Sequence, residues 1–264
     1  MDLSRPMVMG ILNVTPDSFS DGGKYDTLNT ALTQAHQMVN EGAGILDVGG
    51  YSSRPGAADV STQEELDRVI PIIEKLANTV DIPICIDTFR SKVAVAAVQA
   101  GACMVNDISA GEDDADMIFS VAALGVPYIA MHKQGRSKIM QNNPQYTDVV
   151  GEVLGYLLAK KEECCAAGIT DLIIDPGFGF GKTVEHNYTL LKQLKIFNSL
   201  GLPLMVGLSR KSMIYNFLET DANNALNGTT FLHSFALQNG VNLLRVHDVK
   251  EAVECVKLFE KMRG

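Results

Sequence analysis

The stretch IPICIDTFRSKVAVAAVQAGACMVND, residues 82–107, contains the unit from which the fold is built. A short apolar run at Ile82–Ile86 ends at Asp87, and a second run at Cys103–Val105 ends at Asn106. Runs this short do not make helices, but they suit strands that are buried on both faces. The segment between them has the length of a helix, so the stretch predicts a β-α-β unit with parallel strands.

Similar runs recur along the chain at intervals of about 33 residues, the size of a β-α repeat. The runs are Met7–Leu12, Ile45–Val48, Ile82–Ile86, Cys103–Val105, Val126–Met131, Leu172–Ile174, Leu202–Leu208 and Leu243–Val246. They are followed by Asn13, Gly49, Asp87, Asn106, His132, Asp175, Ser209 and His247. Eight such repeats in 264 residues predict a single-domain (β/α)8 barrel, a TIM barrel, over residues 1–264. The carboxyl ends of the strands meet in one ring in this fold, and active sites lie there.

The charge and composition disfavour several classes of protein. There are 31 Asp and Glu residues against 22 Lys and Arg, and the net charge of −9 argues against nucleic-acid binding, which needs a basic surface. No apolar run approaches the ~20 residues that cross a bilayer, and the N-terminus does not have the pattern of a secretory signal. We expect a cytoplasmic protein with no membrane partner and with its five cysteines reduced and in the core.

The stretch 62–78 has the apolar stripe of a helix that packs on a barrel. Thr62 and Glu65 stand in capping-box spacing at its start. Pro71 lies inside the stretch, and proline in a helix removes a hydrogen bond, so we expect a kink or a later start there.

The stretch DPGFGFGKT, residues 175–183, nearly matches a phosphate-binding P-loop. The pattern GxxxxGK[ST] requires glycine at position 176, where this chain has Pro176. The glycine spacing also differs from the GxGxxG of a Rossmann site, and residues 207–211 lack the second glycine of a nucleophile elbow. Nucleotide hydrolysis and Ser–His–acid catalysis are therefore disfavoured.

Asp87, Asn106 and Asp175 each follow an apolar strand directly. A buried carboxylate is costly unless it is paired or bound to a ligand rich in hydrogen-bond donors. Two acids and an amide can together bind the N–H and NH2 groups of a fused heterocycle. Each residue alone is equally explained as a strand-end cap or an internal ion pair, but the three in one ring favour a ligand.

Cationic residues gather at the ends of the last two strands. Lys211, Arg245 and His247 stand where such barrels commonly hold phosphate. A helix that begins beside Ser209 and Ser212 adds free backbone N–H groups, which favour an anion. A buried Lys211 can instead form a Schiff base, and the residue types alone leave that alternative open.

The loops after the first two strands, NVTPDSFSDGG (13–23) and GGYSSRPG (49–56), are rich in glycine and turn residues. The first contains Phe19 and two acids, as lids often do, and Arg54 in the second can form a fork onto phosphate or carboxylate. An ordinary barrel loop and a surface turn explain them equally well. His132, after the fifth strand, is left without a role.

Seven motifs in order carry a resemblance to a known family: GILNVTPDSFSDGG, GGYSSRPG, IDTFR, VNDISAG, DPGFGFGK, GLSRKSMI and RVHDV. On these motifs nearly the whole chain resembles the dihydropteroate synthases, pterin-binding enzymes of folate synthesis that sulfonamides inhibit. The resemblance implies a (β/α)8 barrel that is usually a homodimer. It also implies a transferase that joins 6-hydroxymethyl-7,8-dihydropterin diphosphate to p-aminobenzoate by dissociative substitution, releasing diphosphate and 7,8-dihydropteroate.

The resemblance further implies roles for individual residues. The pterin ring is expected against Asp87, Asn106, Met131, Asp175, Phe180, Gly207, Lys211 and Arg245. Diphosphate is expected against Asn13, Arg54, Arg245 and His247, with Mg2+ held through Asn13. p-Aminobenzoate is expected between Phe19, Ser53 and Pro55, with its carboxylate near Ser212. Catalysis is expected to depend on Lys211, Arg54, Arg245 and His247.

The chain departs from the family pattern in the second loop, where Tyr51 replaces an acid and Ser53 replaces a threonine. MHKQGRSKIMQ also replaces the more usual MHMRGTPQTMQ after the fifth strand. Three rival functions remain. One is a pterin-binding methyltransferase that acts on methyltetrahydrofolate, which is expected to lack the SRKS and RVHDV motifs. The others are an aldolase that uses Lys211 as a Schiff base and a pterin-binding protein without catalysis.

Overall fold

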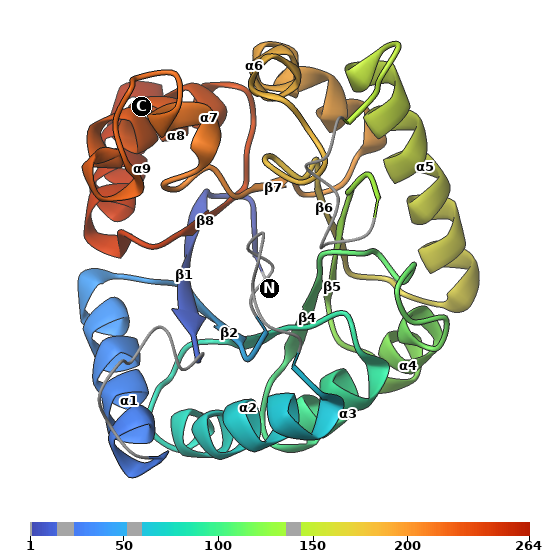
Figure 1. Ribbon diagram of the computed structural model, residues 1–264, viewed down its shortest axis with the longest axis vertical. Coiled ribbons are helices and arrows are strands. Elements are labelled where there is room, and N and C mark those ends of the chain that lie inside the picture. The colour runs from blue at the N-terminus through green and yellow to red at the C-terminus, as the bar shows by residue number, and fades with distance from the viewer. Residues whose placement is uncertain (1, 15–23, 52–59, 136–143) are drawn as a thin grey trace.

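The strands form one parallel 8-stranded sheet in the order β6-β5-β4-β3-β2-β1-β8-β7. The computed structural model describes residues 2–14, 24–51, 60–135 and 144–264. A parallel bridge between Ile174 and Leu204 joins the two ends of the sheet. The strands are β1 (Met7–Asn13), β2 (Ile45–Gly49), β3 (Ile84–Asp87), β4 (Met104–Asp107), β5 (Tyr128–Met131), β6 (Leu172–Asp175), β7 (Met205–Val206) and β8 (Leu243–Val246). The predicted (β/α)8 barrel is confirmed (Figure 1).

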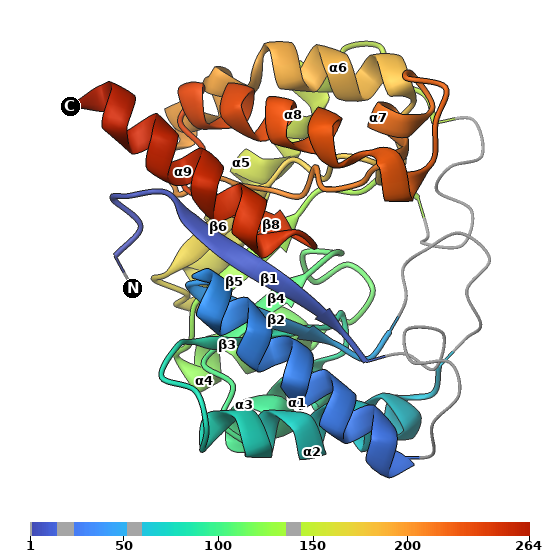
Figure 2. The same cartoon turned by 90° about the vertical axis from the view of Figure 1, so that its left-hand side faces the viewer.

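Helices surround the strands on the outside of the barrel (Figure 1). They are α1 (Lys24–Glu41), α2 (Thr62–Ala77), α3 (Ser91–Gln99), α4 (Met117–Leu124), α5 (Val149–Ala167), α6 (Val184–Lys192), α7 (Ser212–Tyr215), α8 (Leu226–Gln238) and α9 (Val249–Arg263), with 3-10 helices at Leu194–Leu200 and Ala222–Asn224. Both chain ends lie at the amino end of the barrel (Figure 2). Within the described part of the chain, no helix combines the length and apolarity that a membrane span requires.

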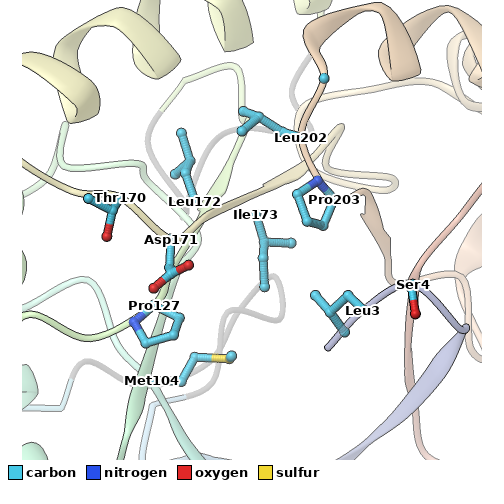
Figure 3. Close-up of a pocket in the computed structure, with 11 residues that line it drawn as sticks. Leu3, Ser4, Met104, Pro127, Thr170, Asp171, Leu172, Ile173, Leu202 and Pro203 are labelled. Atoms are coloured by element: carbon cyan, nitrogen blue, oxygen red, sulfur yellow. The ribbon is translucent and has the colours of Figure 1, made fainter. Parts of the chain in front are cut away.

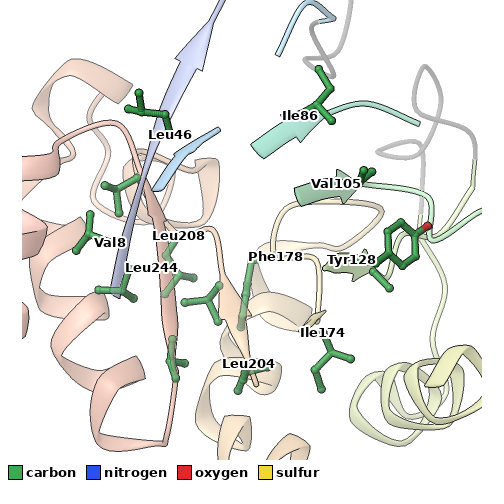
Figure 4. Packing of buried hydrophobic residues seen from close by; sticks show 14 of the residues in the cluster. Val8, Leu46, Ile86, Val105, Tyr128, Ile174, Phe178, Leu204, Leu208 and Leu244 are labelled. Atoms are coloured by element: carbon green, nitrogen blue, oxygen red, sulfur yellow. The ribbon is translucent and has the colours of Figure 1, made fainter. Parts of the chain in front are cut away.

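Alternation of side chains along each strand divides the apolar residues into two cores. One face packs outward against the helices and includes Val8, Leu46, Ile86 and Leu244 (Figure 4). The other face points into the barrel and forms an apolar floor of Met9, Ile45, Cys85, Met104, Ile129, Ile173, Met205 and Leu243. Because both faces are buried, the strands are continuous apolar runs, as the sequence indicated.

The predicted strand Leu202–Leu208 is wrong in extent, because only Met205–Val206 is a strand. Pro203 lacks the backbone N–H that a strand needs, so the paired segment begins beyond it. Five other strands extend past their predicted ends, to Asn13 in β1, Gly49 in β2, Asp87 in β3, Asp107 in β4 and Asp175 in β6. Polar side chains therefore belong to the strands themselves and do not merely follow them.

The expected capping box at Thr62 is also displaced. Ser61 caps α2, and its side chain accepts a hydrogen bond from the Glu64 backbone N–H at 3.1 Å. Glu65 is instead fully buried and pairs with Arg90. The expected later start is wrong, because α2 begins at Thr62 and runs continuously past Pro71.

The cysteines divide between the core and the surface. All are free thiols, and Cys85, Cys164 and Cys255 are buried, but Cys103 and Cys165 are exposed. The prediction that the cysteines lie in the core is therefore wrong for these two. Cys103 directly precedes the strand ladder of β4, and Cys165 lies near the end of α5.

Candidate active site

A ring of mostly polar residues lies directly above the apolar floor, toward the carboxyl ends of the strands. Since side chains alternate, the residue two positions beyond each member of the floor also points inward. These positions are Ile11, Asp47, Asp87, Asn106, Met131, Asp175, Gly207 and Arg245. The ring thus contains six residues predicted from the sequence, Asp87, Asn106, Met131, Asp175, Gly207 and Arg245, and adds Asp47, which was not predicted.

Arg245 connects the acids of the ring. Its Nε donates to Asp47 Oδ2 at 2.6 Å, and its terminal nitrogen donates to Asp87 Oδ2 at 2.5 Å. Asn106 Nδ2 also donates to Asp47 Oδ2, at 3.1 Å. Burial alone lowers the pKa of the Arg245 guanidinium, but Asp47 and Asp87 outweigh this effect and raise the pKa above its ordinary value. Arg245 is therefore a permanent cation at the base of the site.

Asp87 and Asn106 are neighbours in the β3–β4 register and face the centre of the ring. Burial raises the pKa of the Asp87 carboxyl to about 7, although Arg245 opposes the change. Asn106 Oδ1 is buried, and within the described residues it has no hydrogen-bond partner. A buried acceptor of this kind is costly unless a ligand supplies a donor.

Asp175 lies across the ring on β6 and accepts a hydrogen bond from the Gly177 backbone N–H at 2.7 Å. Burial raises its pKa. Lys211 is near it, donates from Nζ to the Phe178 carbonyl, and lies 4.3 Å from the centre of the Phe180 ring. Burial lowers the pKa of Lys211 to about 8. The structure therefore brings Phe180 and Lys211 together beside the second acid.

Lys182 explains why the stretch 175–183 is not a phosphate loop. Its Nζ donates to the carbonyls of Gly177 at 2.9 Å and Phe180 at 3.1 Å, and it lies 2.9 Å from His132 Nδ1. The side chain is almost fully buried, so it holds its own loop and does not face a ligand. His132, which had no predicted role, supports this loop from β5.

The anion side of the site is formed by the segments after β7 and β8. Ser209 Oγ lies 3.0 Å from His247 Nδ1 and accepts the His247 backbone N–H at 3.2 Å. Arg210 and Asp248 form two further hydrogen bonds, at 2.8 and 2.7 Å, between the same segments. The helix α7 begins at Ser212 as expected, but it has only 4 residues.

Asn13 ends β1, and its Oδ1 points toward Gly49, as does Asp87 Oδ2. The site therefore includes an amide oxygen at the position where Mg2+ was expected. Phe19, Ser53, Arg54 and Pro55 lie outside the described residues, so their expected roles stay predictions.

Tyr51, one of the departures from the family pattern, packs its ring against Phe89, with 5.1 Å between the ring centres. The Arg90 guanidinium lies 5.5 Å from the centre of the Tyr51 ring. Arg90 also pairs with buried Glu65. An aromatic ring at position 51 thus has a packing partner of its own, which an acid would not use in this way.

A cavity of about 450 Å³ lies at the opposite, amino end of the barrel. Leu3, Met104, Pro127, Ile173 and Pro203 are among its lining residues (Figure 3). Residues at this end of a barrel usually contribute to the stability of the fold and not to catalysis. The cavity lies below the apolar floor and is separate from the polar ring.

Asp47 was missed because it stands inside the apolar run Ile45–Val48, where its neighbours dominate the pattern. A signal was nevertheless available, since an acid in a strand buried on both faces needs a partner. The period of two from Ile45 to Asp47, and from Leu243 to Arg245, places both side chains inside the barrel.

Comparison with known proteins agrees with this geometry. Residues 9–247 match the family model described as "Pterin binding enzyme". The dihydropteroate synthase of Escherichia coli (strain K12) is 47% identical over 263 residues, covering 98% of this chain and 93% of that protein. A Yersinia pestis dihydropteroate synthase with a sulfonamide drug complex is 45% identical, with a TM-score of 0.94, covering 100% of this chain and 96% of that one. A Xanthomonas albilineans dihydropteroate synthase in complex with 7,8-dihydropteroate is 40% identical, with a TM-score of 0.91, and covers 100% and 96%.

The barrel, its polar ring and the family match define a class of protein: the chain belongs to the pterin-binding enzymes. Within that family, the relatives compared above are dihydropteroate synthases, and this chain spans nearly their full length.

Proposed function

We propose that this chain is a dihydropteroate synthase, a transferase of folate synthesis. It condenses 6-hydroxymethyl-7,8-dihydropterin diphosphate with p-aminobenzoate and releases diphosphate and 7,8-dihydropteroate. The observation that carries the proposal is the polar ring of Asp87, Asn106 and Asp175 above an apolar floor, in a barrel whose relatives catalyse this reaction.

The polar side chains above the apolar floor bind the edge of the pterin. Asp87 and Asp175 accept the ring's N–H and NH2 groups, and the unpartnered Asn106 Oδ1 accepts another donor. Arg245 stacks on the ring, and Met131, Gly207 and Phe180 shape the pocket around it. Lys211 donates to an acceptor of the ring from beside Asp175. Donors and acceptors that meet in a buried site discriminate strongly against ligands that leave one of them unpaired.

The leaving diphosphate develops negative charge, which cations must stabilise. Arg245 and His247 supply this charge, and Arg54 from the second loop is proposed to join them. Ser209 Oγ lies 3.0 Å from His247 Nδ1 and so fixes the orientation of the His247 ring. The other ring nitrogen, Nε2, is then turned away from Ser209. The C–O bond breaks first, and the neutral arylamine then attacks the cationic methylene carbon and loses a proton to solvent, so the chain needs no strong general base.

Mg2+ fits the donor set of the site. This ion keeps several of its waters and is commonly held by one or two protein oxygens together with substrate phosphates. Asn13 Oδ1 offers one such oxygen at the strand end, and within the described residues there is no cluster of His, Cys, Asp and Glu that would hold an ion by itself. When bound with diphosphate, Mg2+ neutralises part of the leaving-group charge.

p-Aminobenzoate is proposed to bind last, between Phe19, Ser53 and Pro55, with its carboxylate near Ser212. Ser212 begins α7 and lies two residues after the Arg210–Asp248 pair that fixes this segment. Ser53 keeps the hydroxyl of the family's threonine, so its hydrogen bond is expected to persist.

The enzyme is proposed to be a cytoplasmic homodimer. Large apolar side chains are exposed at Phe217, Leu218, Phe231, Leu258 and Met262, on or beside α7, α8 and α9. Exposed apolar surface is typical of protein interfaces, and a second copy is proposed to cover side chains of this set. The free cysteines suit a reducing compartment.

One assay separates the proposal from its rivals. Purified protein with the pterin diphosphate should release diphosphate only when p-aminobenzoate is added, with 7,8-dihydropteroate formed in equal amount. Methyl transfer from methyltetrahydrofolate, or a borohydride-stable adduct at Lys211, would contradict the proposal. Ring binding without any release would instead identify a pterin-binding protein without catalysis.

A further inference from the structure

Arg245 stands between two carboxylates that differ in their access to the site. Asp47 is fully buried, with a side-chain exposure of 0%, whereas the side chains of Asp87 and Arg245 are each 20% exposed. A ligand can therefore reach Asp87 and Arg245 from the barrel mouth but cannot reach Asp47. Any effect of Asp47 on the reaction must pass through its neighbours.

The hydrogen bonds show which neighbours these are. Asp47 Oδ2 accepts from Arg245 Nε and from Asn106 Nδ2, so one buried oxygen holds two residues of the ring. The other end of the guanidinium donates to Asp87. In this arrangement the guanidinium occupies an oxygen of Asp87 that the pterin edge would need.

We propose that Asp47 is a positioning residue. It holds Arg245 in the site, so that the terminal nitrogen of Arg245 can release Asp87 to the pterin ring. This inference rests on the proposed function and deepens it. A buried guanidinium needs a carboxylate partner, because an unpaired buried charge is costly. With Asp47 present, Arg245 keeps one partner when Asp87 turns to the ring. Without the charge of Asp47, Arg245 keeps Asp87 for itself and competes with the ligand.

A double-mutant cycle tests this role. The Kd for 6-hydroxymethylpterin is measured by calorimetry for the wild type, Asp47→Asn, Arg245→Met and the double variant. Asp47→Asn keeps the shape and an oxygen for Asn106, but it removes the charge that faces Arg245. We expect Asp47→Asn to raise Kd about tenfold or more, a loss typical of a hydrogen bond to a charged group. The double variant should match Arg245→Met within about twofold, because the two residues act as one unit.

Asp107→Asn is the matched control. Asp107 is a fully buried acid on β4, and it accepts hydrogen bonds from Ser109, Gly111 and Tyr128, none of them in the ring. Its loss should lower the Tm, and its effect on Kd should be the same with Arg245 or Met at position 245. The proposed role is wrong if the effects of Asp47→Asn and Arg245→Met on Kd multiply, as is expected for the independent residues Asp107 and Arg245. It is also wrong if Asp47→Asn leaves Kd unchanged.

The pH dependence gives a readout that a purely structural role would not change. Burial is the main cause of the raised pKa of Asp87, about 7; the Arg245 guanidinium opposes it, and the charges of Asp47, Glu65 and Asp107 add to it. Asp47→Asn should therefore move the midpoint of pterin binding to lower pH, and an unchanged midpoint would contradict the proposal.

Should Asp47→Asn not fold, Arg245→Lys tests the same contact. Lysine keeps the positive charge but has no Nε donor for Asp47, so Kd should still rise about tenfold. A Kd near that of the wild type would overturn the inference. Failure of diphosphate release by the wild type would contradict the proposed function alone, since the cycle measures ring binding and not turnover.

Discussion

The loop after β6 offers the sharpest test of how backbone geometry supports the site. Gly177 has φ of 71°, in the left-handed region, and a Cβ added there would lie 1.8 Å from the His132 carbonyl oxygen. We predict that Gly177→Ala destabilises the protein strongly. A left-handed alanine costs about 1–2 kcal/mol, of which about 0.4–1 kcal/mol is offset in the unfolded chain. Overpacking against a backbone oxygen, which cannot rotate away, adds about 1–3 kcal/mol.

Gly125→Ala is the control for backbone conformation alone. Gly125 ends α4 with φ of 65°, and nothing lies within 4 Å of an added Cβ. It should cost about 1 kcal/mol, against about 2–4 kcal/mol for Gly177→Ala. Urea unfolding measures both, since the free energy of unfolding falls linearly with denaturant.

The two variants should differ in function as well. Gly177 precedes Phe178, whose carbonyl accepts from Lys211, so a shift of this loop should weaken pterin binding. Gly125 lies between α4 and the amino end of β5, at the other end of that strand from the ring, and Gly125→Ala should bind the pterin normally. Equal unfolding free energies for the two variants would refute the steric reasoning, and normal binding by Gly177→Ala would refute the link to Lys211.

Three further predictions concern single side chains. Asp87→Asn should raise the Kd for 6-hydroxymethylpterin about 10- to 100-fold by calorimetry, and an unchanged Kd would remove Asp87 from ring recognition. Burial lowers the pKa of His233 to about 4 from 6.5, so the unfolded state binds more protons in that range. The free energy of unfolding should therefore fall as the pH drops from 6.5 to 4, and His233→Gln should flatten this fall by up to about 1.4 kcal/mol per pH unit in urea titrations. Ser209→Ala, which removes the hydroxyl beside His247, should lower kcat about tenfold and leave the KM for p-aminobenzoate unchanged; equal kcat would contradict a role for Ser209 in orienting the ring.

The fold was predictable because both faces of the strands are buried. Runs such as Leu243–Val246 have no helical period and end at polar residues, so their number and spacing indicated the barrel. Strand lengths were less predictable. Pro203 shortens β7 because it has no backbone N–H to donate to the sheet. Hydropathy does not show this, since the neighbours of Pro203 are apolar.

The site was predictable where a polar residue follows an apolar run, as Asp87, Asn106 and Asp175 do, but Asp47, which interrupts a run, was missed. The hydrogen-bond partners of polar side chains in the loops were not predictable in the same way. Lys182 belongs to a motif that suggests phosphate binding, yet its contacts are with its own loop and His132. Long-range contacts of this kind depend on how the loops fold over the barrel, which local pattern does not determine.

The placement of the cysteines has a practical consequence for experiments in solution. Cys103 and Cys165 are exposed, and both lie near the amino ends of the strands, away from the ring. The buried thiol of Cys85 has a pKa raised well above its ordinary value by burial, so it should resist alkylation. Maleimide dyes should therefore attach at the two surface positions first, which would allow fluorescence measurements on an enzyme whose substrate end carries no label.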